Sequence, residues 1–435
     1  MKQAVILAGG EGLRLKEISG GLPKPMVPVK GKVLLQYLIE QCVHYGISDI
    51  KLLVSYKKEV IKDFFGDGNQ FGASIQYIDE QRPKGTAGAL IESLPELDEQ
   101  FLVIYGDTYF DIDLCSFSKF HKEKAGDVSI FLHPNDHPHD SDLVEIGSNL
   151  QVQKIHPYPH DDQWKQNLVN AAIYIFNKNS LNDYNFTIDR PDIAKQLFPM
   201  MLKNKKKIYG YVSSEYIKDM GTPKRLSIVE RDIDSGKVKL LKKQTKKIAI
   251  FLDRDGTINE EVGHLCDIEN FNLIKGVGEA ICQINAAGIL AIVITNQPVV
   301  ARGELGESDL KMIHNKMDTL LGRQGAYLDQ LYYCPHHTDI GFDGEIKSLK
   351  IDCDCRKPKI GLFKNAESEF NISLEKSWFI GDSTRDILAA QKAGMKSILV
   401  LTGLAGKDKR YKVKPDTVQN DLKAAINFIM KEIGK

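Results

Sequence analysis

Strand-like and helix-like segments alternate in two separate series along this chain, and this double alternation most constrains the fold. The first series covers residues 1–230, where hydrophobic runs such as AVILAG and FLVIYGD are separated by amphipathic stretches such as VLLQYLIEQCVHYG. The second series opens at KIAIFLDRDG and closes at SILVLTG. Such alternation is typical of α/β domains with mostly parallel sheets. We therefore expect two doubly wound, Rossmann-like domains in tandem.

The length and a basic stretch indicate where the domains divide. The chain has 435 residues, which exceeds the roughly 100–200 residues of one ordinary domain. The stretch SGKVKLLKKQTKK at 235–247 is polar and strongly basic, and we interpret it as a linker between domains at 1–234 and 248–435. The stretch HPNDHPHDSD at 133–142 is rich in His, Pro and Asp and is predicted to be a surface loop.

The balance of positive and negative residues argues against some classes of binding partner. Lys plus Arg and Asp plus Glu both number 58, so no overall basic field favours nucleic acid or an anionic membrane. The start, MKQAVILAGGEG, has no signal-peptide features, and no apolar run approaches the ~18 residues of a membrane span. We expect a cytoplasmic enzyme of small anionic molecules, with a homo-oligomer left open.

The first series carries a phosphate-binding pattern. AVILAGGEGLRL at 4–15 is a buried strand followed by a glycine turn, whose backbone amides can approach a polyphosphate closely. LPKPMVPV holds Lys24 between two prolines, so its ammonium is fixed in place to balance phosphate charge. Asp107 ends the FLVIYGD strand and Asp219 precedes the turn of IKDMGTP. Two such carboxylates can share one Mg²⁺.

GGEGLRL, LPKPM, PKGTAGAL, YGD and DMGTP, in this order, resemble the sugar-1-phosphate nucleotidyltransferases over most of residues 1–230. The resemblance implies that Arg14 and Lys24 bind a nucleoside triphosphate and that Asp107 and Asp219 hold Mg²⁺. It also implies that Asn170 contacts the acceptor sugar. The residues implied to contact the nucleotide are Ala8, Gly9, Gly10, Gly12, Glu80 and Gly85. The chain departs from the family pattern at Leu13, and KIHPYP stands where the family usually has a Glu-Lys-Pro segment.

The second series begins with FLDRDGT at 251–257, a hydrophobic strand that runs into Asp253 and Asp255. One carboxylate of such a pair can attack phosphorus while its neighbour handles the proton. This motif resembles the haloacid-dehalogenase-like phosphatases, and the later motifs TNQ, CRKPK and FIGDSTRD follow in the family's order. The resemblance implies a nucleophile at Asp253 and an acid/base at Asp255. It further implies that Thr295, Asn296 and Lys357 contact the phosphate. The implied Mg²⁺ ligands are Asp253, Asp255 and Asp382, and Asp386 lies one helical turn beyond Asp382.

A third pattern predicts a zinc site. YYCPHH and CDCRK offer Cys334, His336, Cys353 and Cys355. Three thiolates and one imidazole form a closed tetrahedral set, which suits structural rather than catalytic zinc. His337 could replace His336, because sequence alone does not decide which imidazole turns inward.

With CPHH and CDCRKP, the second half resembles more narrowly the heptose-1,7-bisphosphate 7-phosphatases, which lack a large cap and are close to histidinol phosphatases. This resemblance implies that Arg302 and Arg356 hold the second phosphate of the substrate. The chain departs from that family at Pro298 to Val300 after TNQ, and at Ser383 where a lysine is frequent.

The two halves together predict consecutive reactions. Removal of the 7-phosphate from heptose 1,7-bisphosphate leaves heptose 1-phosphate, and the first half, which looks most like the heptose 1-phosphate guanylyltransferases, would convert this to GDP-heptose with GTP. Three alternatives stay open: another nucleotide or sugar 1-phosphate, a histidinol phosphatase in the second half, and a non-catalytic binding module in the first half.

Overall fold

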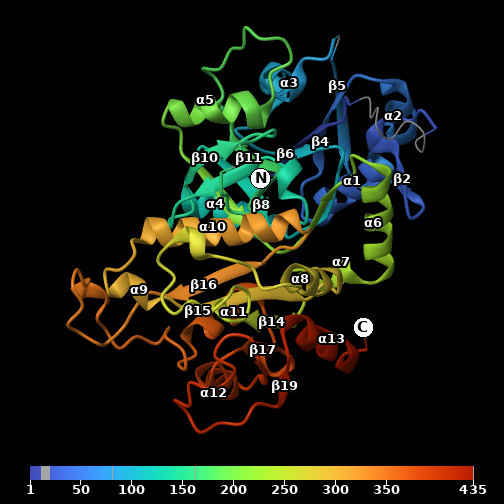
Figure 1. The fold of residues 1–435 in the computed structure, drawn as a ribbon. Coiled ribbons are helices and arrows are strands. Elements are labelled where there is room, and N and C mark those ends of the chain that lie inside the picture. The colour runs from blue at the N-terminus through green and yellow to red at the C-terminus, as the bar shows by residue number, and fades with distance from the viewer. Residues whose placement is uncertain (11–19, 81, 162, 435) are drawn as a thin grey trace. The chain divides into compact units, whose positions relative to one another are not determined.

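The computed structural model describes residues 1–10, 20–80, 82–161 and 163–434 (Figure 1). The chain divides into two compact units, and each is described by itself below. The first unit comprises residues 1–133, 141–160 and 168–242, and the second comprises 134–140, 161–167 and 243–435. Both units are α/β, so the expected tandem of Rossmann-like domains is confirmed.

The first unit is built on a nine-stranded sheet, with the main order β10-β9-β11-β6-β1-β4-β5 and with β8 joining β11 to β12. Its strands are β1 (Gln3–Leu7), β4 (Asp49–Val54), β5 (Ser74–Asp79), β6 (Gln100–Tyr105), β8 (Val128–His133), β9 (Leu143–Ile146), β10 (Val152–His156), β11 (Val169–Asn177) and β12 (Ile208–Val212). The expected parallel pairing holds for β5-β4-β1-β6 and for β8-β12, whereas β11 is antiparallel to β6, β8 and β9. The sheet is mixed partly because β9 and β10 are joined by a short turn, and a short connection permits only antiparallel neighbours.

Helices and two small strand pairs complete the first unit. The helices are α1 (Leu34–His44), α2 (Lys58–Phe65), α3 (Gly85–Ser93), α4 (Leu114–Lys124), α5 (Phe198–Lys203), α6 (Pro223–Asp234) and α7 (Lys237–Leu240). The small strand pairs are β2 (Pro28–Val29) with β3 (Lys32–Val33), and β7 (Thr108–Asp111) with β13 (Tyr216–Asp219). Helix α7 lies within the stretch interpreted as a linker, and Val238 and Leu241 there are buried. Part of this stretch is therefore folded.

The second unit contains a six-stranded, fully parallel sheet with the order β16-β15-β14-β17-β18-β19. Its strands are β14 (Ala249–Leu252), β15 (Leu290–Asn296), β16 (Gln330–Cys334), β17 (Trp378–Gly381), β18 (Lys396–Val400) and β19 (Thr417–Gln419). Its helices are α8 (Val277–Ala286), α9 (Pro298–Ala301), α10 (Glu307–Arg323), α11 (Gly361–Phe370), α12 (Thr384–Ala393) and α13 (Leu422–Glu432). The strand order reverses direction between β14 and β17, which is where doubly wound sheets bind their ligands.

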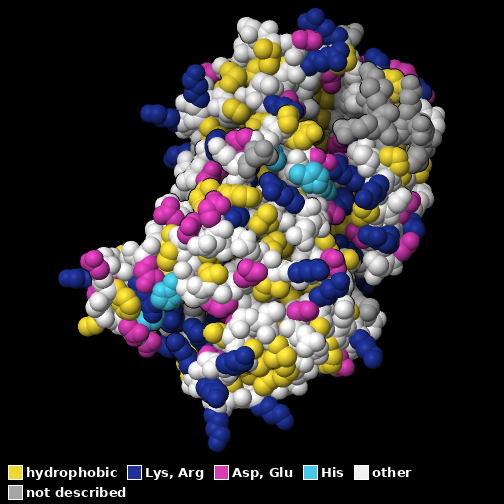
Figure 2. Space-filling view, in the orientation of Figure 1, with side chains coloured by type: hydrophobic (Ala, Val, Ile, Leu, Met, Phe, Trp, Pro, Cys, Tyr) yellow, Lys and Arg dark blue, Asp and Glu magenta, His cyan; other side chains and the backbone are white. Residues whose placement is uncertain are grey.

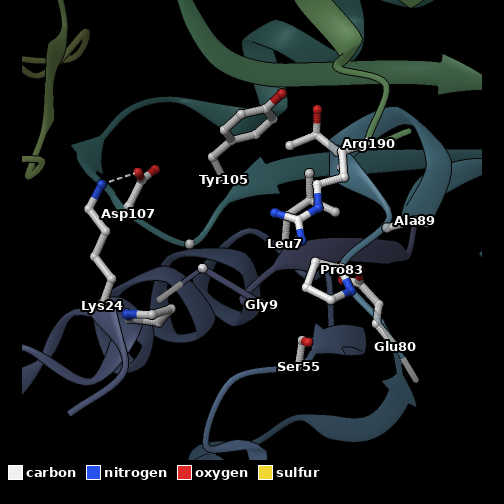
Figure 3. A pocket seen from close by; sticks show the side chains of 15 residues that line it. Leu7, Gly9, Lys24, Ser55, Glu80, Pro83, Ala89, Tyr105, Asp107 and Arg190 are labelled. Atoms are coloured by element: carbon white, nitrogen blue, oxygen red, sulfur yellow. Dashed lines mark hydrogen bonds and ion pairs between the residues drawn. The ribbon is translucent and has the colours of Figure 1, made fainter. Parts of the chain in front are cut away.

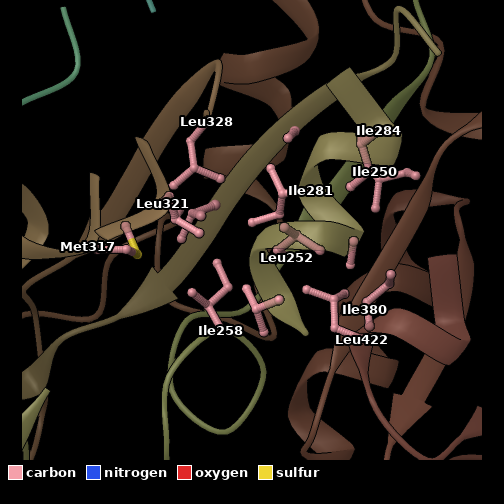
Figure 4. Packing of buried hydrophobic residues seen from close by; sticks show 14 of the residues in the cluster. Ile250, Leu252, Ile258, Ile281, Ile284, Met317, Leu321, Leu328, Ile380 and Leu422 are labelled. Atoms are coloured by element: carbon pink, nitrogen blue, oxygen red, sulfur yellow. The ribbon is translucent and has the colours of Figure 1, made fainter. Parts of the chain in front are cut away.

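Both faces of this second sheet are buried. Ile250 and Leu252 of β14 point toward Ile281 of α8 and Leu422 of α13 (Figure 4). Phe251, the residue between them, points to the opposite face, where its ring lies 5.2 Å from that of Phe363 in α11. Because successive strand residues alternate between faces, a continuous apolar strand is required here. Each such buried side chain contributes roughly 1.5–3 kcal/mol to stability.

Two short segments from the first half of the sequence group with the second unit. Asn167 Nδ2 donates to the backbone oxygen of Asn135 at 2.8 Å, and Asn167 N donates to the Asp318 carboxylate at 3.2 Å. His133 and Asn135 are buried, so the prediction of a surface loop at 133–142 is wrong for its first residues. Proline-rich and polar composition predicted exposure, but these backbone and amide hydrogen bonds compensate for burial.

Basic and acidic side chains are interspersed on the face shown in Figure 2, in keeping with their equal numbers in the sequence. Among the described residues, none of the helices combines the length and apolar character that a bilayer crossing requires.

Candidate active sites

The first candidate site lies at the carboxyl ends of β1 and β6, between which the order of the parallel strands reverses. The loops after the two strands touch, since Gly106 N donates to Leu7 O at 3.0 Å. Gly9 also lies close to its neighbours: a Cβ there would be 3.1 Å from Glu80 Oε1 and 3.3 Å from Ser55 Cβ. A glycine at position 9 thus lets the chain pass close to the β4 and β5 loops.

A cavity of about 350 Å³ opens beside these loops (Figure 3). Its lining brings together six residues predicted from sequence, namely Gly9, Gly10, Lys24, Glu80, Gly85 and Asp107. Ser55, Tyr105 and Arg190 also line it and were missed. Arg190 lies about a hundred residues beyond Glu80 in the sequence, and no motif marks it. Its position depends on a close contact, because a Cβ on Gly85 (φ +70°) would lie only 2.4 Å from the Arg190 carbonyl carbon.

Asp107 lines this cavity, whereas Asp219 is not part of its described lining. Asp107 forms an ion pair with Lys24. Asp219 stands opposite Thr108 in the β7-β13 pair, and Met220 N donates to Asp107 O at 2.8 Å. The guanidinium of Arg225 donates to Asp219 Oδ2 at 2.6 Å. The backbone pairing therefore brings the two segments that carry these carboxylates together, and such a pair suits Mg²⁺ with phosphate and water as further ligands.

The remaining predicted residues of the first half lie elsewhere. Ala8 is buried, with its N–H donating to Leu53 O at 2.8 Å. The side chain of Asn170 accepts from Ala172 N at 3.0 Å. Neither belongs to the described lining of the cavity. The predictions for Gly12 and Arg14 fall outside the described residues.

The second candidate site lies where the order of the second sheet reverses. Asp253 follows β14 and Asp382 follows β17, and Asp253 N donates to Ile380 O at 2.9 Å. Thr295 and Asn296 end the neighbouring strand β15. These residues and Lys357 line one cavity of about 280 Å³. The structure therefore brings together the predicted nucleophile, phosphate contacts and magnesium ligand.

Lys357 is the central cation of this site. Its ammonium lies 2.8 Å from both Asp253 Oδ1 and Asp386 Oδ1, and its side chain is only 2% exposed. Burial acts to lower the pKa of Lys357, but the attraction of these two carboxylates outweighs it and raises the pKa. Asn296 fixes the lysine backbone, since its side chain donates to Lys357 O at 3.1 Å and accepts from Lys357 N at 3.0 Å. The lysine is therefore held charged beside the nucleophile.

Asp255 is oriented by a buried arginine that sequence analysis missed. Arg254 is fully buried and donates to both oxygens of Asp255, at 2.7 and 2.9 Å from Nη2. Asn259 and Gln297 side chains also donate to Asp255, at 3.0 and 2.9 Å. Burial acts to raise the pKa of Asp255, but Arg254 and these hydrogen bonds hold it below its usual value. The motif DRD does not indicate that the side chain of its middle residue, Arg254, is buried.

Three carboxylates form a cluster beside Lys357. Ligand atoms of Asp253, Asp382 and Asp386 lie within 4.8 Å of one another. Asp255, the third predicted Mg²⁺ ligand, lines the same cavity. Burial, reinforced by the neighbouring carboxylates, raises the pKa of Asp253 to about 7 and that of Asp382 to about 8. One lysine does not balance three carboxylates, and a divalent cation such as Mg²⁺ would fit this cluster and favour its ionised form.

Glycines hold Asp382 in this cluster. A Cβ on Gly256 or on Gly403 would lie 2.2 Å from Asp382 Oδ2, and both glycines have positive φ angles of 73° and 57°. The carboxylate also accepts from Leu404 N at 2.6 Å. Asp382 is thus enclosed by backbone on both sides.

The predicted zinc ligands converge. The Sγ atoms of Cys334, Cys353 and Cys355 lie 3.1–3.5 Å apart, and His336 Nδ1 lies 3.2 Å from Cys355 Sγ. These separations approach the ~3.8 Å that tetrahedral zinc with bonds of ~2.3 Å requires. His337 instead lines the cavity, so the structure places His336 with the cysteines. Arg356 Nη1 donates to His336 O at 3.1 Å, which ties the cluster to the loop that carries Lys357.

Cations other than Lys357 line the outer part of the same cavity. They comprise the predicted Arg302 and Arg356 together with Arg385 and Arg410, which were missed. Burial lowers the pKa of Arg356, and the neighbouring Arg385 and Arg302 lower it further. Buried Nε atoms of Arg302 and Arg385 have no hydrogen-bond partner among the described residues. These arginine nitrogens can therefore donate hydrogen bonds to an anion bound in this part of the cavity.

Comparison with known proteins gives a family for each half of the chain. Residues 3–236 match the family model described as nucleotidyl transferase, and residues 354–425 match the model described as HAD-hydrolase-like. A D-glycero-beta-D-manno-heptose-1,7-bisphosphate 7-phosphatase of Haemophilus ducreyi is 40% identical over 185 residues, which are 42% of this chain and 98% of that protein. The chain therefore belongs to the nucleotidyl transferase family, and its C-terminal part belongs with the heptose-bisphosphate phosphatases of the haloacid-dehalogenase-like class.

Two solved structures are similar to the separate halves. HddC from Yersinia pseudotuberculosis complexed with GMP-PN is 29% identical, with a TM-score of 0.46, and covers 54% of this chain and 100% of its own. A D,D-heptose 1.7-bisphosphate phosphatase from B. bronchiseptica, complexed with magnesium and phosphate, is 30% identical, with a TM-score of 0.38, and covers 42% of this chain and 99% of its own. The family matches and the sequence relative alone show that the chain is a bifunctional sugar-phosphate enzyme with nucleotidyltransferase and phosphatase activities.

Proposed function

We propose that the second unit removes the 7-phosphate of D-glycero-D-manno-heptose 1,7-bisphosphate and that the first unit converts the resulting heptose 1-phosphate to GDP-heptose. The observation that carries this proposal is the meeting of Asp253, Lys357 and Asp382 beside a cavity rich in arginine. We further propose the division predicted from sequence, with a transferase at 1–234, a connection at 235–247 and a phosphatase at 248–435.

In the phosphatase, an Asp253 oxygen attacks the 7-phosphorus and the bond from phosphorus to the sugar oxygen breaks. Asp255 gives its proton to that leaving oxygen, then takes one from the water that attacks the aspartyl-phosphate and releases inorganic phosphate. The resting enzyme holds Asp255 ionised, with its pKa lowered. The negative charge of a bound phosphate raises that pKa and favours the protonated acid.

Lys357, Thr295 and Asn296 contact the transferred phosphoryl group and stabilise its transition state. Mg²⁺, held by Asp253 and Asp382 with Asp386 close by, would neutralise phosphate charge in this site. Zinc on Cys334, His336, Cys353 and Cys355 would be structural, because four protein ligands leave no position for water.

The four arginines support a substrate with a second phosphate. Lys357 already serves the reacting group, so Arg302, Arg356, Arg385 and Arg410 exceed what one phosphate needs. They also argue against the histidinol phosphatase alternative, because histidinol phosphate carries a positive ammonium group that this region would repel. Comparing kcat/KM on heptose 1,7-bisphosphate and on histidinol phosphate decides between the two, and a preference for histidinol phosphate would refute the assignment.

In the transferase, an oxygen of heptose 1-phosphate attacks the α-phosphorus of GTP, and the bond to the leaving pyrophosphate breaks. Lys24 stabilises the triphosphate, and Asp107 and Asp219 would hold Mg²⁺. Guanine is favoured because its edge presents two donors and one carbonyl acceptor. Glu80 can accept from those donors, and Arg190, on the same cavity, can donate to the carbonyl.

The decisive experiment incubates the full-length protein with heptose 1,7-bisphosphate, Mg²⁺ and each nucleoside triphosphate in turn, with products identified by mass. GDP-heptose is expected with GTP, and another nucleotide sugar would correct the base. Asp253→Asn should abolish phosphate release and leave nucleotidyl transfer to supplied heptose 1-phosphate intact, and Asp107→Ala should do the reverse. A wild-type protein that releases phosphate but never forms a nucleotide sugar would favour the alternative of a non-catalytic first half.

A further inference from the structure

Arg225 is a partly buried cation beside the predicted magnesium ligand Asp219, and no sequence motif assigned it a role. It lies in the first turn of α6, where Thr222 Oγ1 accepts from its backbone N–H at 3.3 Å. Its guanidinium reaches back to Asp219 Oδ2 at 2.6 Å, and its side chain is 16% exposed. The helix start therefore fixes the position of this guanidinium relative to the predicted magnesium ligand.

Gly221 reveals how closely the charged groups converge. A Cβ built on this glycine would lie 3.0 Å from Asp219 Oδ2 and 3.8 Å from both Lys24 Nζ and Arg225 Nη1. One small volume is thus within reach of two cations that come from separate parts of the sequence. A side chain at position 221 would occupy this volume.

Each of the two cations forms an ion pair with one of the two carboxylates. Lys24 is paired with Asp107, and Arg225 is paired with Asp219. A divalent cation at the two carboxylates would weaken both ion pairs and let Lys24 and Arg225 bind phosphate oxygens. The reaction brings two anionic groups to this place, the triphosphate of the nucleotide and the phosphate of the sugar. Apart from Arg190, which lies away from Asp107 (Figure 3), Lys24 is the basic residue of the described cavity lining.

We propose that Arg225 binds the phosphate group of the sugar 1-phosphate acceptor and holds its attacking oxygen toward the α-phosphorus, while Lys24 serves the triphosphate. The planar guanidinium suits this task because it can bind two phosphate oxygens at once. This inference rests on the proposed transferase function, but it concerns any sugar 1-phosphate and does not depend on the heptose.

The test compares Arg225→Met and Arg225→Lys with Lys224→Met, a change of the exposed lysine next in sequence. Initial rates give the KM for GTP and for heptose 1-phosphate, and calorimetry gives the Kd for heptose 1-phosphate without turnover. Loss of a charged hydrogen bond should raise the acceptor KM and Kd at least about tenfold in Arg225→Met. The KM for GTP should stay within about twofold, Arg225→Lys should recover part of the loss, and Lys224→Met should match the wild type.

Other results would overturn the inference. If Arg225 only orients Asp219, its loss would raise the Mg²⁺ concentration needed for half-maximal rate and leave the acceptor Kd unchanged. A larger change for GTP than for the acceptor would assign Arg225 to the triphosphate instead. Mannose 1-phosphate and glucose 1-phosphate serve as parallel acceptors. If one of them is used as the acceptor in place of heptose 1-phosphate and its binding still requires Arg225, the heptose assignment fails and the role of Arg225 stands. Should calorimetry detect no binding of any of the three, both fail.

Discussion

The Arg254–Asp255 pair allows a sharp prediction about stability, because its two partners differ in exposure. The Arg254 side chain is 0% exposed and the Asp255 side chain is 23% exposed. Asp255→Asn leaves a fully buried guanidinium without its counter-charge, which should cost about 3–5 kcal/mol. Arg254→Met leaves a carboxylate that still reaches solvent and still accepts from Asn259 and Gln297. That loss should be smaller, about 1–3 kcal/mol.

The double variant Arg254→Met/Asp255→Asn leaves neither charge unpaired, so it should be more stable than Asp255→Asn alone. The expected coupling between the two sites is about 1–3 kcal/mol. Such a result would show that the pair orients Asp255 and adds little net stability to the fold. Buried ion pairs replaced by apolar groups often behave in this way.

Urea unfolding at neutral pH, followed by tryptophan fluorescence, measures these losses in the full-length protein. The chain has two tryptophans, and both Trp164 and Trp378 lie in the second unit, so the signal reports on that unit. A loss of 3–5 kcal/mol corresponds to a midpoint shift of about 1–3 M. Lys364→Met is the control, because its exposed pair with Glu367 should contribute under about 1 kcal/mol. If Asp255→Asn shifts the midpoint no more than this control does, the reasoning from burial is wrong.

Two further predictions concern the separate units. Gly85→Ala places a methyl group 2.4 Å from the Arg190 carbonyl carbon at a φ of +70°. Backbone strain of roughly 1–3 kcal/mol should therefore raise the KM for GTP about five- to 150-fold. An unchanged KM, with phosphatase activity as the internal reference, would contradict this prediction. Cys355→Ser should remove bound zinc and lower the melting temperature of the second unit, as metal analysis and calorimetry can check. Full zinc content in that variant would rule out the proposed ligand set.

The sequence was sufficient to predict the α/β class and the elements that carry the second site. Asp253, Thr295 and Asp382 each end a hydrophobic strand, and parallel strands place their carboxyl ends at one edge of the sheet. Their convergence could therefore be expected without coordinates. The four zinc ligands could be predicted from their residue types, but the choice of His336 over His337 required the fold.

Contacts between residues remote in sequence were not predictable. Arg190 reaches the first cavity through its contact with Gly85, and Arg410 reaches the second cavity from a segment without a phosphate motif. Arg385 lies inside FIGDSTRD, but the motif does not indicate that this side chain enters the cavity. The burial of Arg254 depends on Asp255 and on His314, whose Nε2 lies 3.3 Å from Arg254 Nη1. The sequence around a residue does not indicate which remote residues its side chain will contact.

The glycines on either side of Asp382 also offer a way to judge other sequences. Any side chain at position 256 or 403 would meet the carboxylate at 2.2 Å, so a relative that keeps all its aspartates but has lost either glycine must hold its metal-binding oxygen elsewhere. We expect such a relative to be a pseudophosphatase that can be recognised from these two positions alone, before any of its acidic residues has changed.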